Sequence, residues 1–167
     1  FDRHIRARID EAQPNHFSVF ALASQPLLIL LGSLFTDKVP AVVYQPHREP
    51  KTWKWQPHPD GFQFRITEPA DKSGTPALVF SLSAKIGPER IESVLGGKVS
   101  IWEVAIDQPH NDFLRSEAQL SMFRETVRRL MVAIKAAHPT ALDLRVFPAM
   151  PVSCAVELGR VRMPKAD

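Results

Sequence analysis

Apolar and polar positions along this chain follow two alternating patterns. Short apolar or strictly alternating runs, typical of β-strands, take turns with stretches whose apolar residues recur every three or four positions, as in helices. The expected strands cover residues 16–23, 41–45, 62–66, 76–83, 99–106 and 142–147. The expected helices cover residues 1–12, 26–35, 87–95 and 112–138, with a last helix beginning at Ser153. This order predicts the α/β class, as a three-layer sandwich around a mostly parallel sheet with some antiparallel edge strands.

The ends of these elements add detail. Residues 62–66 alternate apolar and polar side chains, which predicts a half-exposed antiparallel or edge strand. The longest helix has two possible starts, Asp112 or Ser116, because Ser116 and Gln119 have the spacing of a capping box. Pro139 ends that helix, since proline cannot continue it.

The apolar run from Phe17 to Phe35 is long enough to cross a bilayer, which needs about 20 residues. Ser24, Gln25 and Pro26 interrupt it near its centre with two polar side chains and a helix breaker. The run is therefore predicted to split into a strand and a helix, with Pro26 in the first helical turn, where a missing N–H costs nothing. No signal-peptide pattern is present either, so we expect a cytoplasmic protein without a membrane partner.

Composition narrows the class of protein. With 167 residues, 44% of them apolar and 23% charged, the chain predicts one globular domain over residues 1–167. A net charge of +3, with acidic residues in every segment, argues against direct nucleic-acid binding. Cys154 is the sole cysteine, which excludes an internal disulfide and a zinc site built on cysteine pairs. Because the sequence opens on Phe1 rather than Met, we expect a piece of a longer protein.

Three segments could carry binding chemistry. Ligands of parallel sheets lie beyond the carboxyl ends of the strands, where helix N-termini offer free N–H groups. Residues 24–26, 46–55 and 149–154 fit this description. No Gly-x-Gly-x-x-Gly run or phosphate-binding loop follows a strand, which argues against an NAD- or ATP-dependent enzyme. The chain also lacks an H-E-x-x-H motif, and we expect no metal and no cofactor.

The loop over residues 46–59 combines aromatic faces with cations. Trp53 and Trp55 alternate with Lys51 and Lys54, and Arg48 precedes them. Aromatic faces stack nucleobases, at about 1 to 3 kcal/mol per base, and cations hold phosphates. Alternatively, the two tryptophans point to one face of an extended segment and pack onto the sheet.

Cys154 and Ser153 allow a second function, a small hydrolase with its nucleophile at a helix start. A thiol near a helix N-terminus has a lowered pKa and ionises more readily. No histidine is spaced so as to identify a general base, and a structural buried cysteine fits the same pattern. A third possibility is an oligomerisation module, in which Arg128 and Arg129 of the long helix meet an acidic neighbour, although a solvated face explains them more simply.

Three motifs of the chain resemble the SAVED domain. They are HFSVFALASQPLLILLG at residues 16–32, VYQPHR at residues 43–48 followed by Trp53-Lys54-Trp55, and FPAMPVSCAVELGRVRMPKAD at residues 147–167. Together they span nearly the whole chain, and the last is the most specific. SAVED domains are the sensor halves of effectors in bacterial cyclic-oligonucleotide anti-phage defence (CBASS), and they resemble the CARF sensors of type III CRISPR systems.

The resemblance implies a Rossmann-like, CARF-like ligand-binding module that is not itself an enzyme and has no catalytic residues. It would bind a cyclic di- or trinucleotide made by a cGAS-like nucleotidyltransferase. Binding would drive homo-oligomerisation and switch on a fused effector, such as an HNH or other nuclease, a TIR NADase or a protease. No effector motif is present in this chain, so we expect the effector N-terminal to Phe1.

Residues and resemblance together predict one ligand pocket over the carboxyl edge of the sheet. The backbone N–H groups of residues 151–153 and the cations would receive phosphates, and a tryptophan would stack a purine. Prolines at the strand exits, among them Pro46 and Pro148, would make this edge rigid before the ligand binds. The predicted ligand-binding residues are Ser24, Gln25, Gln45, Arg48, Trp53, Lys54, Trp55, Ser83, Lys85, Met150, Pro151, Ser153 and Cys154.

Overall fold

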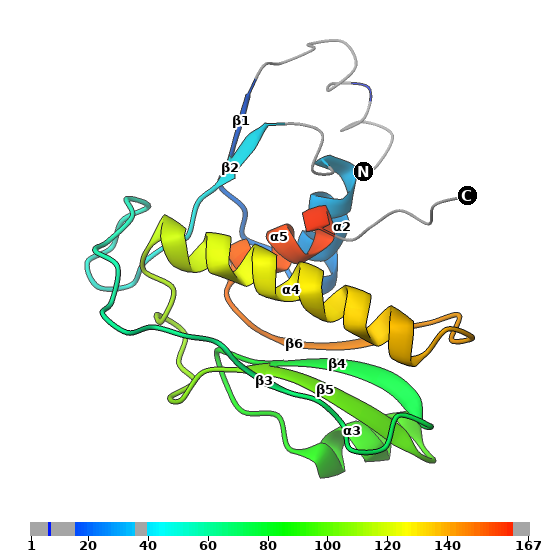
Figure 1. Cartoon of the computed structure of the whole chain (residues 1–167). Coiled ribbons are helices and arrows are strands. Elements are labelled where there is room, and N and C mark those ends of the chain that lie inside the picture. Colours follow the sequence, from blue (N-terminus) through cyan, green and yellow to red (C-terminus); the bar gives the residue numbers. More distant parts are fainter. Residues whose placement is uncertain (1–6, 8–15, 36–39, 162–167) are drawn as a thin grey trace. The chain divides into compact units, whose positions relative to one another are not determined.

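The protein is described by a computed structural model over residues 7, 16–35 and 40–161. It divides into two compact units: unit 1 is Phe1–Gln56 together with Val152–Asp167, and unit 2 is Pro57–Pro151. Apart from residue 7, the helix expected over residues 1–12 lies outside the described residues, as does the end of the third motif, residues 162–167. Unit 1 is thus formed by the first and last parts of the chain, and unit 2 by the continuous segment between them (Figure 1).

Unit 1 contains the predicted strand–helix–strand. Strand β1 (Phe17–Val19) leads into helix α2 (Gln25–Phe35), and strand β2 (Ala41–Val43) pairs parallel with β1 in a two-stranded sheet. The apolar run therefore splits where Pro26 predicts, although both strands are shorter than expected. No helix within the described ranges is long and apolar enough to cross a membrane.

Two glycines let α2 pack closely against the last helix of unit 1, α5 (Val152–Val161). A Cβ on Gly32 would lie 1.9 Å from the carbonyl oxygen of Val156, and a Cβ on Gly159 would lie 2.0 Å from that of Ile29. The two helices therefore touch backbone to backbone, and no larger residue fits at either position without moving a helix.

A buried ion pair fastens α5 to the small sheet. The Arg160 guanidinium lies 3.0 Å from the Glu157 carboxylate, and it donates a second hydrogen bond of 3.0 Å to the carbonyl of Ala41 in β2. The side chains of Arg160 and Glu157 are 9% and 1% exposed. Either charge would be costly to bury alone, so the two must stay together. The pair therefore constrains how α5 packs against β2.

Unit 2 contains a four-stranded sheet in the order β3-β5-β4-β6. The central strands β4 (Thr75–Ser81) and β5 (Val99–Ala105) are parallel, and β4 is also parallel to the edge strand β6 (Arg145–Ala149). The other edge, β3 (Arg65–Thr67), runs antiparallel to β5. The predicted mostly parallel sheet with an antiparallel edge strand is confirmed here.

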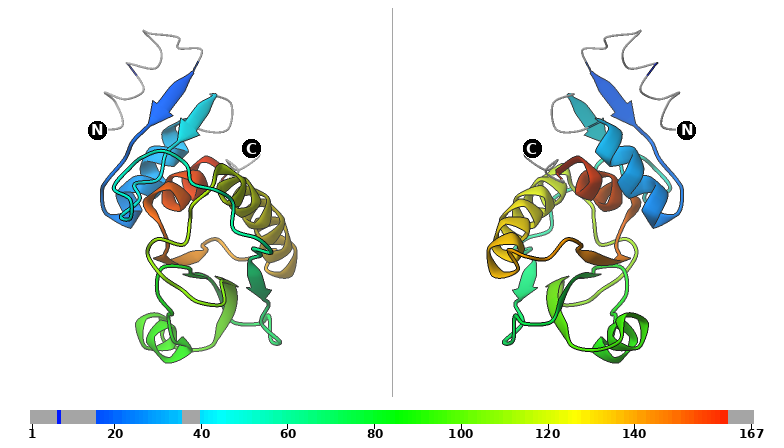
Figure 2. Two further views of the ribbon diagram at one scale, coloured as in Figure 1. Left: turned by 90° about the vertical axis from the view of Figure 1, so that its left-hand side faces the viewer. Right: turned by 90° about the vertical axis from the view of Figure 1, so that its right-hand side faces the viewer.

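Helices cover both faces of this sheet (Figures 1 and 2). On one face, Ile91 of α3 (Pro88–Leu95) packs against Ala77 and Val79 of β4. On the other, Phe123 of α4 (Glu117–Ala137) lies 5.7 Å, ring to ring, from Phe80 of β4. Unit 2 by itself is therefore the predicted three-layer sandwich.

The start of α4 and the end of β6 can be compared with the sequence predictions. The Ser116 hydroxyl accepts the N–H of Gln119, whose side chain in turn accepts the Ser116 N–H, so the capping box starts α4 at Glu117 and not at Asp112. Pro148, expected where the strand leaves the sheet, lies inside β6 instead. Because β6 is an edge strand, a residue without an N–H is tolerated there.

Candidate ligand-binding site

A buried polar contact of unit 1 joins Gln45 to Ser153, two predicted site residues 108 positions apart. The Ser153 hydroxyl donates to Gln45 Oε1 over 2.7 Å, and the Ser153 N–H points to the same oxygen over 3.4 Å. Both residues are buried. The N–H and hydroxyl of Ser153 thus already have an acceptor within the protein, and Pro151 has no N–H. Residues 151–153 therefore offer fewer hydrogen-bond donors to a phosphate than the sequence suggests.

Aromatic side chains of unit 1 gather around the loop that follows β2. Phe20 stacks on Tyr44 with 4.4 Å between ring centroids and 3° between planes, and the rings of Phe20 and Trp53 are nearly perpendicular, with 5.2 Å between their centroids. Phe20 stays 55% exposed although it sits in this cluster, and Trp53 is half-buried. The cluster of Phe20, Tyr44 and Trp53, named here the aromatic cluster, offers flat apolar surface to a ligand.

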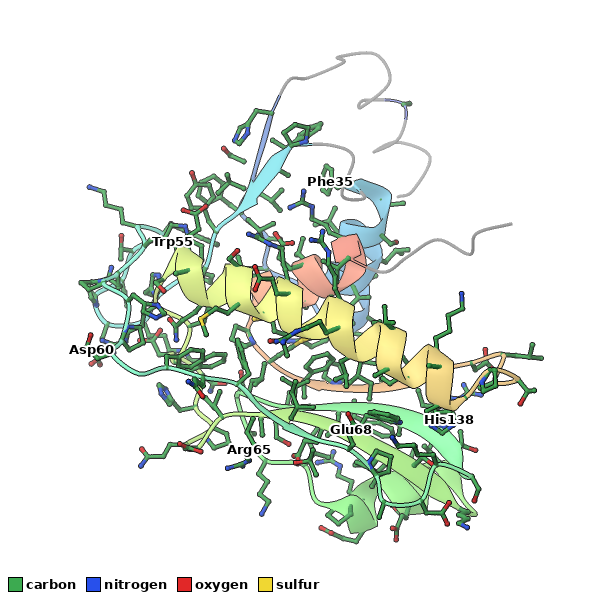
Figure 3. The ribbon with its side chains drawn as sticks, viewed as in Figure 1. Phe35, Trp55, Asp60, Arg65, Glu68 and His138 are labelled. Atoms are coloured by element: carbon green, nitrogen blue, oxygen red, sulfur yellow. The ribbon has the colours of Figure 1, made fainter. Side chains whose placement is uncertain are left out.

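The second tryptophan of the loop has a different environment. Trp55, marked in Figure 3, meets His47 at 6.0 Å in an edge-to-face arrangement. Its Nε1–H is buried and finds no hydrogen-bond acceptor among the described residues. The loop is closed at its base by the His47 N–H, which donates to the Thr52 carbonyl over 2.8 Å. Trp53 and Trp55 therefore have separate aromatic partners.

The other predicted site residues of unit 1, on the loop and at the start of α2, are mostly accessible to solvent. Arg48 and Lys54 are exposed on the loop, as phosphate-binding cations would need to be. Ser24 is exposed too, and its carbonyl accepts the N–H groups of Leu27 and Leu28, which starts α2. Gln25 is half-buried at the first position of that helix.

Cys154 does not have the environment expected of a nucleophile. Its side chain is fully buried, and burial raises the pKa of the thiol, with the nearby Glu157 carboxylate acting in the same direction. The prediction of a lowered pKa at the helix start is therefore wrong, because loss of solvent outweighs the helix N-terminus. The Ser153 hydroxyl donates to an amide oxygen rather than to a base. Neither residue supports the hydrolase alternative.

Four predicted residues belong to unit 2, at the carboxyl ends of its parallel strands. The N–H groups of Leu82 and Ser83 donate to the carbonyl of Ala149 over 2.9 and 2.7 Å, which joins the exits of β4 and β6. Lys85 is exposed just beyond, whereas Met150 and Pro151 are buried. One pocket that combines these residues with those of unit 1 stays a prediction.

Sequence reasoning missed the third exit of this sheet, the segment that follows β5. A cavity of about 470 Å³ opens here. Its lining residues are Pro59, Gly61, Phe62, Gln63, Ile106, Asp107, Gln108, His110, Phe113, Arg115 and Gln119. The N–H of His110 donates to the Leu82 carbonyl over 3.1 Å, so this segment adjoins the exit of β4. A sequence signal for this segment was present, because the polar run from Asp107 to Asp112 separates an expected strand from an expected helix, as two of the three chosen segments do.

A family model, "SMODS-associated and fused to various effectors sensor domain", matches residues 1–167. The chain belongs to the SAVED family. The motifs that suggested this membership contribute β1, most of α2, the last residue of β2, the end of β6 and α5. SAVED is a family of ligand-sensing domains, and no three histidine, cysteine or carboxylate side chains of residues 7, 16–35 and 40–161 are grouped to hold a metal ion.

Solved structures share the fold of this SAVED domain. The chain is similar to the Acinetobacter baumannii Cap4 SAVED/CARF-domain containing receptor with the cyclic trinucleotide 2'3'3'-cAAA, at 12% identity and a TM-score of 0.67. It is similar also to that receptor with 3'3'3'-cAAA, at 13% identity and a TM-score of 0.67. The matches cover 97% and 98% of this chain but 37% of the receptor chain. No curated protein sequence matches the chain.

Proposed function

We propose that this SAVED domain senses a cyclic oligonucleotide, with a cyclic trinucleotide as the first candidate and a cyclic dinucleotide as the second. One observation carries the proposal: the fold extends over nearly the whole length of this chain in receptors whose structures contain cyclic trinucleotides. The domain itself binds and does not catalyse, in keeping with a sensor family.

The aromatic cluster supplies the base-binding part of the proposal. A purine could stack on the open ring surface of Phe20, which is 55% exposed, or on the accessible part of the half-buried Trp53. Stacking tolerates any base and contributes about 1 to 3 kcal/mol. Tyr44 supports Phe20 from behind by parallel stacking. These rings are available before ligand binds, which lowers the ordering cost of association.

Cations on the same loop supply the phosphate-binding part. Arg48 and Lys54 are exposed within six residues of each other, and the bridge between His47 and Thr52 closes the loop that carries Arg48. Guanidinium groups bind phosphate through paired hydrogen bonds, and lysines bind it as point charges. In this proposal the buried bond from Ser153 to Gln45 positions the start of the loop rather than touching the ligand.

For the whole protein, we propose that ligand binding promotes self-association and activates a fused effector, such as a nuclease, in a cytoplasmic anti-phage response. The family description refers to fusion with various effectors, and this chain spans about 37% of the receptor it resembles. Light scattering with and without ligand tests this step: a sensor of this kind gains mass on binding, whereas a constitutive oligomerisation module keeps its mass.

A pair of Trp53 variants tests the base-binding assignment. Trp53→Ala removes the ring and is expected to weaken binding of a cyclic trinucleotide roughly 5- to 150-fold, the range that corresponds to one stacked base. Trp53→Phe keeps an aromatic face and should stay within a few-fold of the wild type. Isothermal titration calorimetry measures both. Equal affinity of Trp53→Ala and wild type would contradict the stacking role.

A further inference from the structure

We propose that the cavity of unit 2, at the carboxyl end of β5, is a nucleotide site that takes a base against phenylalanine rings and a phosphate at Arg115. The nucleotide bound here would be one nucleotide of the cyclic ligand, and in this respect the inference rests on the proposed function. The cavity has about 470 Å³, within the range typical of small-molecule sites, which is roughly 300–1,000 Å³. It lies where α/β sheets place their ligands.

Phenylalanine rings form the apolar wall. Phe62 and Phe113 both line the cavity, and their rings are nearly parallel, at 12° with 6.0 Å between centroids. The ring of Phe64 meets each of them at right angles, at 5.0 and 6.3 Å. Phe113 is buried and Phe62 is half-buried, so Phe62 keeps open surface. A flat, braced and partly open ring is what a base needs for stacking.

Two carboxamides stand on the rim. Gln63 and Gln108 line the cavity, are exposed, and form no side-chain hydrogen bond with any residue that the structure describes. A carboxamide donates and accepts at once, as the edge of an adenine does, so it recognises a base by paired hydrogen bonds. The Asp107 carboxylate, by contrast, lies 3.1 Å from the guanidinium of Arg65 on β3, labelled in Figure 3.

Arg115 supplies the positive charge. Its side chain is exposed at the cavity, and its guanidinium has no carboxylate partner within residues 16–35 and 40–161. Its backbone is fixed, because the Arg115 N–H donates to Gln119 Oε1 over 2.8 Å. An arginine held at the backbone with an open guanidinium is suited to bind a phosphate bidentately.

The walls are formed in advance of any ligand. Gln119 is fully buried and donates from Nε2 to the Phe113 carbonyl over 3.1 Å, which holds residues 113–116 against α4. His58 Nδ1 and Ser116 Oγ are 2.8 Å apart, so the wall of residues 59–63 is tethered to the start of α4 as well. A cavity with both walls fixed loses little entropy on binding, which favours a specific site over an incidental surface hollow.

The test is nuclear magnetic resonance of the isotope-labelled protein titrated with adenosine 5'-monophosphate. The side-chain amide signals of Gln63 and Gln108 and the Arg115 guanidinium signal should shift with saturation. Arg115→Gln and Phe62→Leu should each weaken this binding at least fivefold, whereas Arg129→Gln should not. Arg129 is a matched control because it is an exposed arginine of α4 that lies away from the cavity lining. Thermal melts verify that each variant is folded.

Parallel titrations with 3'3'3'-cAAA and with inorganic phosphate separate the outcomes. Saturable shifts with the mononucleotide support the site, and the same shifts with the cyclic ligand identify its source. If neither nucleotide moves these signals, the inference is overturned even where a cyclic nucleotide binds at the aromatic cluster. Equal shifts with phosphate alone would overturn the base assignment. If the mononucleotide binds here and no cyclic nucleotide binds anywhere, this site stands and the proposed function fails.

Discussion

Units 1 and 2 are stabilised in different ways. Unit 2 has a continuous apolar core in which Leu78, Phe80, Trp102 and Phe123 are all 0% exposed. Unit 1 has only a small sheet of two three-residue strands. Its order comes from a few specific contacts: the glycine crossing of α2 and α5, the buried ion pair and the bond from Ser153 to Gln45. Single substitutions at these contacts should therefore disrupt unit 1 and spare unit 2.

The largest effect is expected from Arg160→Ala. This change removes the Arg160 guanidinium from the buried Glu157 carboxylate and from the Ala41 carbonyl, which should cost about 3–5 kcal/mol of stability. Hydrogen exchange measured by mass spectrometry should show faster exchange in α2 and α5 and unchanged protection in α4. Equal loss of protection in α4 would mean that the two units unfold together, and would contradict a separate stabilisation of unit 1.

The next largest effect is expected from Gly159→Ala. Its new methyl group would meet the Ile29 carbonyl, a backbone atom that cannot move alone, so a loss of about 2–3 kcal/mol is expected in urea denaturation. Gly87→Ala in unit 2 is the matched control. There the methyl group would meet the end of the Glu89 side chain, which can rotate away, so the loss should stay at about 1 kcal/mol or less, the usual cost of alanine at a helix N-cap. Similar losses of stability in both variants would contradict the close backbone packing of α2 against α5.

Ser153→Ala should have a smaller effect. It removes the 2.7 Å hydrogen bond to Gln45 and leaves only the longer one from the N–H, a loss of about 1 kcal/mol. Ser93→Ala serves as the control, because the Ser93 hydroxyl bonds to the Arg90 carbonyl on the exposed side of α3. If the bond positions the loop, cyclic-nucleotide affinity should fall in Ser153→Ala only. Unchanged affinity would limit Ser153 to a structural role.

The smallest effect concerns an exposed charge of unit 2. The ammonium of Lys98 and the N–H of Ser73 hold the pKa of Asp71 well below its usual range. Since the folded pKa is the lower one, this carboxylate stabilises the fold above about pH 4 and the contribution disappears as the pH falls toward the folded pKa. The stability difference between wild type and Asp71→Asn should therefore shrink on acidification below pH 4. A constant difference would contradict the assignment.

Sequence patterns predicted the elements of both units well, because each depends on local chemistry. The capping box of Ser116 and Gln119 fixes the start of α4, and Pro26 marks the turn into α2. The expected strand at residues 62–66 is displaced, since Phe62 and Phe64 turn their rings toward Phe113 and only residues 65–67 enter the sheet. Tertiary packing of the rings overrides the alternating pattern there.

The candidate site was less predictable, because its properties depend on contacts between distant segments. Nothing in the neighbourhood of Cys154 shows that α5 will be buried on all sides, and this burial reverses the direction of its pKa shift. The contact of Gln45 with Ser153 likewise arises only when β2 and α5 come together. The cavity beyond β5 could have been found, by applying the strand-exit rule to residues 107–112.

Whether the domain senses a cyclic oligonucleotide is decided by calorimetric titration of the protein with a panel of cyclic di- and trinucleotides. We expect saturable binding of at least one member of the panel, accompanied by protection of the loop at residues 44–56 from hydrogen exchange. Absence of binding across the whole panel, by protein that circular dichroism shows to be folded, would contradict it.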